Sequence, residues 1–273
     1  MTTLTDQVAY VTAIDPDLLE RVRHETLTIP SGWITEYGEY QSGGWGTLSL
    51  LNATGRSSDV TITDCDPVET DLLAVMPATR RILADLGLHY MWARIARLEP
   101  GGFLWEHRDY GELKAVERHR LHIPLVTSAS AFLSVAGSAV HLSAGHLWRL
   151  TPTYPHGACN LHGPARIHLI LDCYATPTLD DLITGKHLNA DDVRLLPPLD
   201  DELTDLEIRR ALELAQLGYI STAERHLLRL FFTHAMPEGR VYDLISTLHE
   251  SLGDSNAART WRSRKSTLLG TTD

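Results

Sequence analysis

Short strand-like segments dominate the middle of the chain, from about residue 89 to residue 174. The runs YMWARIARL, RLHIPLV, AFLSVAG, AVHLSAG, HLWRLTP and ARIHLILDCY are rich in β-branched and aromatic residues, and Gly and Pro separate them at short intervals. Several short strands at such spacing are typical of a sandwich, a barrel or a jelly roll. The middle of the chain therefore predicts a β core built from many short strands.

The residues before this core mix strand and helix. QVAYVTAI (7–14) reads as a strand, and the helix after it is expected to begin with Asp15 as N-cap and Pro16 at its first position. Residues 29–55 are rich in Gly, Ser, Trp and Tyr, which predicts loops around one short strand near Thr47–Leu51. A further helix is expected over about Val68–Leu86, with a break or kink at Pro77.

Residues 200–273 have helical periodicity instead. One apolar stripe at helical spacing comprises Ile208, Ala211, Leu212 and Ala215. Gly218 is expected to end this helix, a capping box of Ser221 and Glu224 to begin the next, and two more helices to follow. We therefore expect an α+β protein, mainly β with helices. Residues 1–178 would form the β core with an N-terminal strand and helix, and residues 179–273 a C-terminal helical extension.

Composition limits the partners and the location of the protein. The formal net charge of −11 over 273 residues argues against nucleic-acid binding, which usually needs a basic face. No apolar run approaches the length of about 18 residues that a membrane span needs, and the N-terminus does not have the pattern of a signal peptide. The three cysteines have no CxxC spacing, which favours a reducing compartment. We expect a soluble, cytoplasmic protein with no nucleic-acid or membrane partner; the oligomeric state stays open.

The segment LWEHRDYGEL (104–113) contains His107 and Asp109, two residues apart. With 14 His and 20 Asp in the chain, about one such H-x-D is expected by chance, so the spacing alone proves nothing. On a strand, however, residues i and i+2 lie on one face. An imidazole beside a carboxylate supplies two of the three ligands of the facial triad in non-haem Fe(II) oxygenases. The downstream candidates for the second histidine are His119, His122, His141, His146, His156, His162 and His168.

Two strand-like segments each carry an Arg-x-His pair on one face. In RLHIPL this face holds Arg120 and His122, opposite Leu121, Ile123 and Leu125. In RIHLILD it holds Arg166, His168, Ile170 and Asp172, opposite Ile167, Leu169 and Leu171. Either pair alone could be surface decoration of a half-exposed strand. Beside an H-x-D motif, the pairs indicate a pocket for a dianion, because Arg offers a bidentate fork to carboxylate.

Taken together, these motifs resemble a known family. H-x-D, then R-x-H, then the P-H of GHLWRLTPTYPHGACN, then an arginine ten residues later is similar in order and spacing to the 2-oxoglutarate/Fe(II)-dependent oxygenases. Within these, the likeness is to the aspartyl/asparaginyl β-hydroxylase-type family that includes bacterial cis-proline hydroxylases. YGEYQSGGWGTLSLLNATG also looks like the N-terminal, substrate-side segment of that family, so the resemblance runs from about Tyr37 to Asp172.

The resemblance implies a double-stranded β-helix (jelly-roll, cupin-like) core and a hydroxylase that uses Fe(II), 2-oxoglutarate and O2 and releases succinate and CO2. It implies that Fe(II) is held by His107, Asp109 and His156. It also implies that Arg166 pairs with the distal carboxylate of 2-oxoglutarate, with Arg120, His122 and His168 in the same pocket. The presence of Asp109 favours hydroxylation, since related halogenases have a small residue at that ligand position.

The substrate is less constrained than the metal. The candidate substrate residues are Arg118, Trp105, Tyr37, Trp45 and Arg94, although large aromatic residues are more often part of the core. The leading hypothesis is hydroxylation of a small, proline-like amino acid that is free, peptide-borne or carrier-linked. The alternatives are β-hydroxylation of aspartyl or asparaginyl residues in a peptide, and a non-catalytic jelly roll that binds a metal or ligand. A zinc site that includes Cys159 is a further, weaker alternative.

Overall fold

The computed structural model describes residues 3–29, 32–111, 113, 116–185 and 187–270. Its centre is a run of eight strands that alternate between two antiparallel sheets. They are β4 (Tyr90–Leu98), β5 (Gly102–His107), β6 (Arg118–Val126), β7 (Ala131–Val135), β8 (Ser138–Val140), β9 (His146–Leu150), β10 (His156–Asn160) and β11 (Arg166–Tyr174). Successive strands change sheets except at the β7–β8 hairpin, which gives the order β9-β6-β11-β4 in one sheet and β8-β7-β10-β5 in the other. This is a double-stranded β-helix, and the expected fold class is confirmed.

Four further strands extend the two sheets. β1 (Val8–Ala13) pairs with β9 at one edge of the larger sheet, and β2 (Trp45–Asn52) pairs with β4 and with β3 (Val68–Glu69) at the other edge. The short strand expected near Thr47–Leu51 therefore lies inside β2. β12 (Val193–Leu195) pairs with β8 and extends the smaller sheet. The larger sheet thus has seven strands and the smaller one five.

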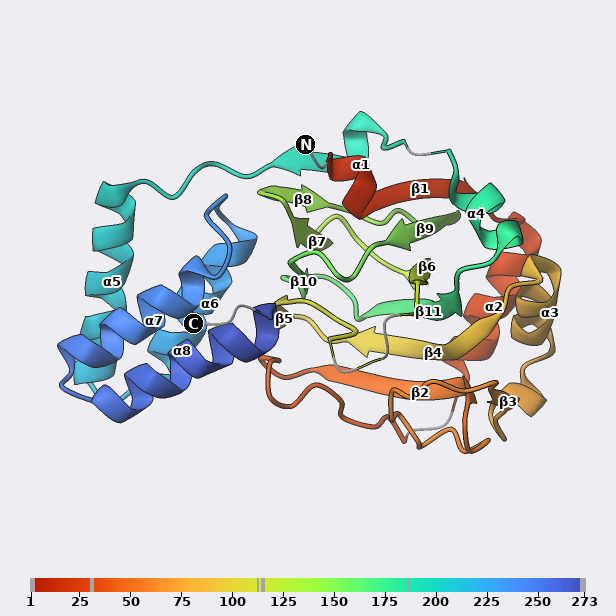
Figure 1. The fold of residues 1–273 in the computed structure, drawn as a ribbon, viewed down its shortest axis with the longest axis horizontal. Helices are drawn as coiled ribbons and strands as arrows, with labels where there is room; N and C mark the ends of the chain where they lie inside the picture. The colour runs from red at the N-terminus through yellow and green to blue at the C-terminus, as the bar shows by residue number, and fades with distance from the viewer. Residues whose placement is uncertain (1–2, 30–31, 112, 114–115, 186, 271–273) are drawn as a thin grey trace.

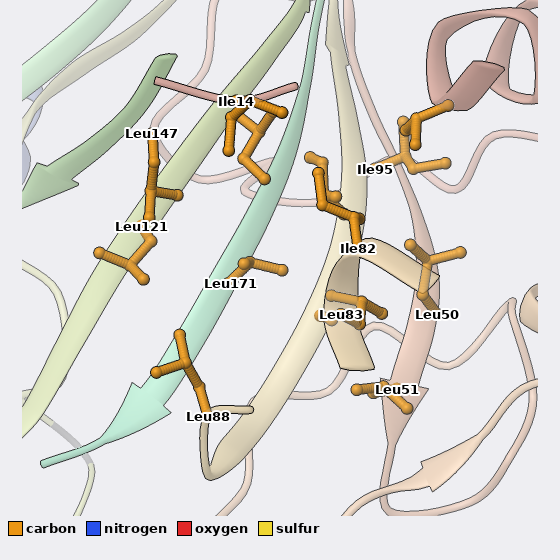
Figure 2. Packing of buried hydrophobic residues seen from close by; sticks show 14 of the residues in the cluster. Ile14, Leu50, Leu51, Ile82, Leu83, Leu88, Ile95, Leu121, Leu147 and Leu171 are labelled. Atoms are coloured by element: carbon orange, nitrogen blue, oxygen red, sulfur yellow. The ribbon is translucent and has the colours of Figure 1, made fainter. Parts of the chain in front are cut away.

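The outer face of the seven-stranded sheet is covered by α2 (Pro16–Leu27) and α3 (Pro77–Leu86), as Figure 1 shows. Leu121 and Ile123 of β6 and Leu169 and Leu171 of β11 point into this layer and are fully buried. Figure 2 shows how Leu121, Leu171 and Ile82 pack there with residues from β2 and β4. The period-two reading of the two R-x-H segments is therefore correct, and their polar residues face the other sheet.

Two expectations for the N-terminal part have different outcomes. Asp15 caps α2, since its carboxylate accepts from the Leu18 N–H at 2.7 Å. The helix expected over Val68–Leu86 is wrong in its first half, which contains β3 and the 3-10 turn η1 (Leu73–Val75). Pro77 begins α3 and does not kink a longer helix, because a proline lacks an N–H and is favoured at the first position.

After α4 (Pro177–Ile183), η2 (Ala190–Asp192) and β12, the chain forms a bundle of helices. These are α5 (Asp201–Gln216), α6 (Ile220–Arg229), the turn η3 (Leu230–Phe232), α7 (Arg240–Ser251) and α8 (Ser255–Leu269). Because β12 still belongs to a sheet, the helical unit proper begins at α5, and the domain division after residue 178 stays a prediction. No helix in the described part of the chain is long and apolar enough to cross a membrane.

The helical unit packs on the outer face of the five-stranded sheet (Figure 1). Phe103 of β5 and Phe132 of β7 lie in one cluster with Phe231, Phe232 and Tyr242. The space between the two sheets holds the inward-facing residues of both, polar and apolar.

The helix boundaries partly follow the sequence. Gly218, with a φ of +90°, follows the end of α5 as expected. The capping box is wrong: α6 begins at Ile220 after Tyr219, and no side chain caps it. Glu224 instead accepts hydrogen bonds from His249 and Trp261. The carboxylate that the local sequence pattern predicted to cap α6 therefore makes tertiary contacts.

Candidate active site

Three buried side chains converge in the space between the two sheets: His107 at the end of β5, Asp109 just after it, and His156 at the start of β10. One ligand atom from each lies within 4.8 Å of the others. His107 Nε2 is 3.6 Å from Asp109 Oδ1, and His156 Nε2 is 3.7 Å from Asp109 Oδ2. Two imidazoles and one carboxylate form the ligand set of a mononuclear non-haem iron site.

The two histidines meet because of strand pairing, and Asp109 meets them because of a bend. His107 lies opposite His156 in the β5–β10 pair, with ring centroids 4.4 Å apart. β5 ends at His107, so the expectation that Asp109 shares a strand face with it is wrong. The Asp109 N–H donates to the Pro152 carbonyl at 2.9 Å, and Tyr110 then has a φ of +70°, which is unusual for a residue other than glycine. The loop before β10 therefore turns the carboxylate toward the imidazoles.

Backbone carbonyls orient both imidazoles. His107 Nδ1 donates to the Trp105 carbonyl at 2.7 Å and His156 Nδ1 to the Tyr154 carbonyl at 2.9 Å. The proton on Nδ1 leaves the lone pair on Nε2, the atom that faces Asp109. Burial lowers the pKa of His107, and burial together with His107 lowers that of His156 to about 3. Both rings are thus neutral, the form that binds a metal.

An ion-pair network lies behind the carboxylate. Arg120 donates from Nη1 to Asp109 Oδ2 and from Nε to Asp172 Oδ1, the latter at 2.7 Å. Asp172, fully buried, also accepts from Arg94 and from the Tyr110 hydroxyl. Burial alone would raise the pKa of Asp109, but Arg120 and the two histidines outweigh it and hold that pKa at about 2. Asp109 is therefore ionised.

A second cationic group lies on β6 and β11 and has no carboxylate in contact within the described residues. Arg166 Nη2 donates to His168 Nδ1 at 3.0 Å, and His168 Nδ1 is 3.4 Å from His122 Nδ1. Burial and the neighbouring Arg166 hold the pKa of His122 and His168 well below the usual range. Arg166 Nη1, His122 Nε2 and His168 Nε2 are buried without a hydrogen-bond partner among the described residues.

One cavity between the two sheets connects these groups. Besides the three triad residues, its walls include six of the residues predicted for the site: Tyr37, Trp45, Arg94, Arg120, His122 and Arg166. The remaining lining is apolar, with Leu104, Leu133, Leu150, Ala158 and Ile170. His168 lies directly behind Arg166 and His122. The sequence-based set is thus largely brought together around one space.

Two candidate substrate residues lie elsewhere. Trp105 is on the outer face of β5, where it stacks on Trp261 at a centroid distance of 5.1 Å. Arg118 forms an ion pair with Asp64 outside the cavity. Cys159 also faces away from the triad, in the apolar cluster under the helical unit, so the zinc alternative finds no ligand there. The alternation of side chains along β10 explains the placement of Cys159. Trp105 lies on the face opposite His107 because the register of β5 shifts between Leu104 and His107.

The family to which the chain belongs agrees with this geometry. Residues 11–176, more than half of the chain, match the aspartyl/asparaginyl β-hydroxylase family. The chain belongs to this family. It is a 2-oxoglutarate/Fe(II)-dependent oxygenase, and the expectation of an enzyme is confirmed.

Relatives of this hydroxylase are named for hydroxylation of L-proline. L-proline cis-3-hydroxylase 1 from Streptomyces sp is 26% identical over 257 residues, which cover 88% of this chain and 87% of the relative. L-proline cis-4-hydroxylase from Rhizobium meliloti (strain 1021) is 26% identical over 147 residues, 51% of each chain. A solved oxygenase of the 2OG-Fe(II) family from Burkholderia pseudomallei has a TM-score of 0.40 at 16% identity, covering 60% of this chain and 80% of that one.

The residues of this hydroxylase fit the metal and co-substrate of its family. Two neutral imidazoles and an ionised carboxylate suit Fe(II) better than a closed structural zinc site, which usually has four protein ligands. The unpartnered Nη1 of Arg166, which lines the cavity, fits a carboxylate, because a buried donor with no acceptor is costly. Both conclusions rest on the ligand atoms and hydrogen-bond donors that the cavity itself presents.

Four residues around this site were not predicted to belong to it. Asp172 was placed on the correct face of β11 without a role, and Tyr110 was noted only as a neighbour of the H-x-D motif. Tyr40 packs on His107 at a ring distance of 4.7 Å. The carboxylate of Glu36 accepts from Thr47 at 2.6 Å, and burial raises the pKa of Glu36. The segment YGEYQSGGW contained a signal for Tyr40, since this stretch resembles the substrate-side segment of the family.

Proposed function

We propose that this protein hydroxylates a free, small, proline-like amino acid, with Fe(II) held by His107, Asp109 and His156. The observation that carries the proposal is the arrangement of charge in the pocket between the sheets: two separate arginine groups flank one buried triad. Two arginine groups suit two reactants that each carry a carboxylate, the co-substrate and an amino acid.

We assign the Arg166 group to 2-oxoglutarate. Arg166 is fully buried and its Nη1 is not engaged by any described residue, so it can donate to the distal carboxylate. His168 accepts from Arg166 at Nδ1 at 3.0 Å and so helps to orient the guanidinium. His122 lines the same end of the cavity.

We assign the other end of the cavity to the amino acid. Arg94 and Arg120 both contact Asp172, and Arg94 Nε and Arg120 Nη2 have no partner in the described part of the chain. These donors fit the substrate carboxylate, while Tyr37 and Trp45 offer aromatic surface to an apolar ring. The L-proline activity named for two relatives supports a cyclic amino acid.

The chain's part in the reaction is binding, orientation and exclusion of water. When bound, Fe(II) and 2-oxoglutarate supply the oxidising chemistry, and succinate and CO2 leave as the products of the co-substrate. Arg120 keeps Asp109 ionised and oriented, and the carbonyls of Trp105 and Tyr154 keep the two imidazoles in the metal-binding tautomer. The buried walls hold both reactants out of bulk water.

The test is an aerobic assay with Fe(II), 2-oxoglutarate and a panel of amino acids, followed by succinate release and mass spectrometry. We expect succinate together with a product heavier by one oxygen atom from L-proline or a close ring analogue. N-acetyl-proline and an aspartyl-containing peptide are the matched probes. Turnover of the peptide with none of the free amino acids would support the alternative, β-hydroxylation of peptide residues, and would overturn the proposal.

A further inference from the structure

β5 contains an irregularity next to its metal ligand. In the pairing of β5 with β10, Leu104 lies opposite Ala158 and His107 lies opposite His156, so three steps on β5 match two on β10. One extra residue on β5 at this point is a β-bulge, which bends a strand and re-aims the side chain that follows. The bulge explains why Leu104 and His107 both line the cavity although they are three residues apart.

The bulge is bound by the start of α7. The Tyr242 hydroxyl donates to the backbone carbonyl of Glu106, and the Gly239 N–H donates to Glu106 Oε2 at 2.9 Å. Glu106 and Tyr242 are both buried. A bulged residue leaves the regular ladder, and a buried carbonyl needs a donor. Tyr242 supplies this donor from an element more than a hundred residues away in the sequence.

The residue after His107 is tied to the same helical unit. The Arg108 N–H donates to the Leu268 carbonyl at the end of α8 at 2.8 Å, and Arg108 Nη2 donates to Glu238 at 2.8 Å. α8 ends beside β5 (Figure 1). The backbone on both sides of His107 is therefore held by α7, α8 and the turn before α7.

We propose that the C-terminal helical unit positions the iron ligand His107, and that Tyr242 is the positioning residue through its bond to the Glu106 carbonyl. The inference rests on the assignment of His107 as a metal ligand in the proposed function. Without the Tyr242 hydroxyl, the bulge loses the donor that fixes its carbonyl, and the direction of His107 is less well defined. Groups that orient a metal ligand from outside the ligand set affect metal affinity about 10- to 100-fold.

The test compares two α7 variants that each lose one buried hydroxyl. Tyr242→Phe removes the bond to Glu106 and keeps the ring. Ser246→Ala removes a bond of Ser246 Oγ to the Ala258 carbonyl, 3.1 Å long, that stays within the helical unit. Ni(II) binding to the apo-protein is measured by calorimetry, and thermal unfolding of the apo-protein is measured in parallel.

We expect Tyr242→Phe to weaken Ni(II) binding about tenfold, while Ser246→Ala binds Ni(II) as the unmodified protein does. Equal Ni(II) affinity of Tyr242→Phe and the unmodified protein would overturn the proposal. So would an equal loss in both variants, since it would indicate general loosening of the helical unit. Failure of the metal assignment is a different result: the unmodified protein and Asp109→Ala would then show the same weak binding. Failure of the substrate assignment would leave all Ni(II) measurements as expected.

Discussion

Arg120 joins Asp109 to Asp172 across the inner face of the larger sheet. Its Nη1 donates to one oxygen of Asp109, and its Nε donates to Asp172 at 2.7 Å. Asp172 lies opposite Arg120 in the pairing of β11 with β6, so strand register brings the two together. The result is a buried carboxylate with one oxygen occupied by Arg120 and the other, Oδ1, 3.6 Å from His107 Nε2.

Replacing Arg120 with methionine should destabilise the apo-protein strongly. Arg120→Met leaves two buried carboxylates without this partner, and breaking a buried ion pair costs about 3–5 kcal/mol. Arg80→Met is the control, because the Arg80–Glu69 pair is half-exposed and worth at most about 1 kcal/mol. Denaturant unfolding measures both, and equal stabilities of the two variants would contradict the role given to Arg120.

Loss of the Asp109 carboxylate should abolish iron binding while the fold is retained. We expect Asp109→Ala to lose the weak visible absorption that forms when Fe(II) and 2-oxoglutarate are mixed with the protein without oxygen. Asp85→Ala, at an exposed carboxylate of α3, should keep the band. Full turnover by Asp109→Ala would show that the metal is held elsewhere.

Arg166 should determine the affinity for 2-oxoglutarate. Arg166→Gln removes a buried, charge-assisted pair with the distal carboxylate, and we expect about a 100-fold higher KM for 2-oxoglutarate, equivalent to about 3 kcal/mol. The KM for the amino acid should change little. Arg97→Gln, at a partly exposed arginine paired with Glu99, is the control. If Arg166→Gln raised only the KM for the amino acid, the assignments of 2-oxoglutarate and the amino acid to the two ends of the cavity would have to be exchanged.

Acidification should destabilise the apo-protein between pH 7 and pH 5. The buried histidines of the site are His107, His122, His156 and His168, and burial lowers the pKa of each. In the unfolded chain these groups take up protons near pH 6.5, while the folded protein does not. Each can therefore reduce the free energy of unfolding by up to about 1.4 kcal/mol per pH unit below that point.

Two buried glutamates act in the opposite direction in the same range. Burial raises the pKa of Glu106 to about 7 and also raises that of Glu36, so the folded protein binds these protons first. The four histidines outnumber them, and the net slope should keep its sign. Urea unfolding of metal-free protein at pH 7, 6 and 5 measures it, and Glu106→Gln should steepen the loss. Stability that rises on acidification would contradict the assigned pKa directions.

The faces of the central strands could be predicted from the sequence. Side chains alternate along a strand with a period of two, so Arg120 and His122 had to share one face and Leu121 and Ile123 the other. The structure follows that division: the leucines and isoleucines lie under α2 and α3, and the polar residues face the other sheet. A local rule of this kind needs no knowledge of which strand lies next to which.

The proposed metal ligands could also be predicted from the sequence. The order and spacing of the motifs resemble a known family, and that resemblance implies which residues hold the metal. His107, Asp109 and His156 are the three residues that meet, in an arrangement that could hold a metal ion. The geometric reason given for the first two was wrong, since a bulge and a bend place them. A bulge depends on how a strand pairs with another strand far away in the sequence, and a local sequence pattern carries no information about that pairing.

The sequence by itself determined which side chains face inward on β6 and β11, and that one set of them is charged. Only the tertiary structure decided which of these charges meet. Register placed Asp172 opposite Arg120, and the helical unit bound Glu106 and Arg108 beside the ligand strand. The physical reason is that alternation along a strand follows from local backbone geometry, whereas register and bulges follow from contacts between segments far apart in the chain.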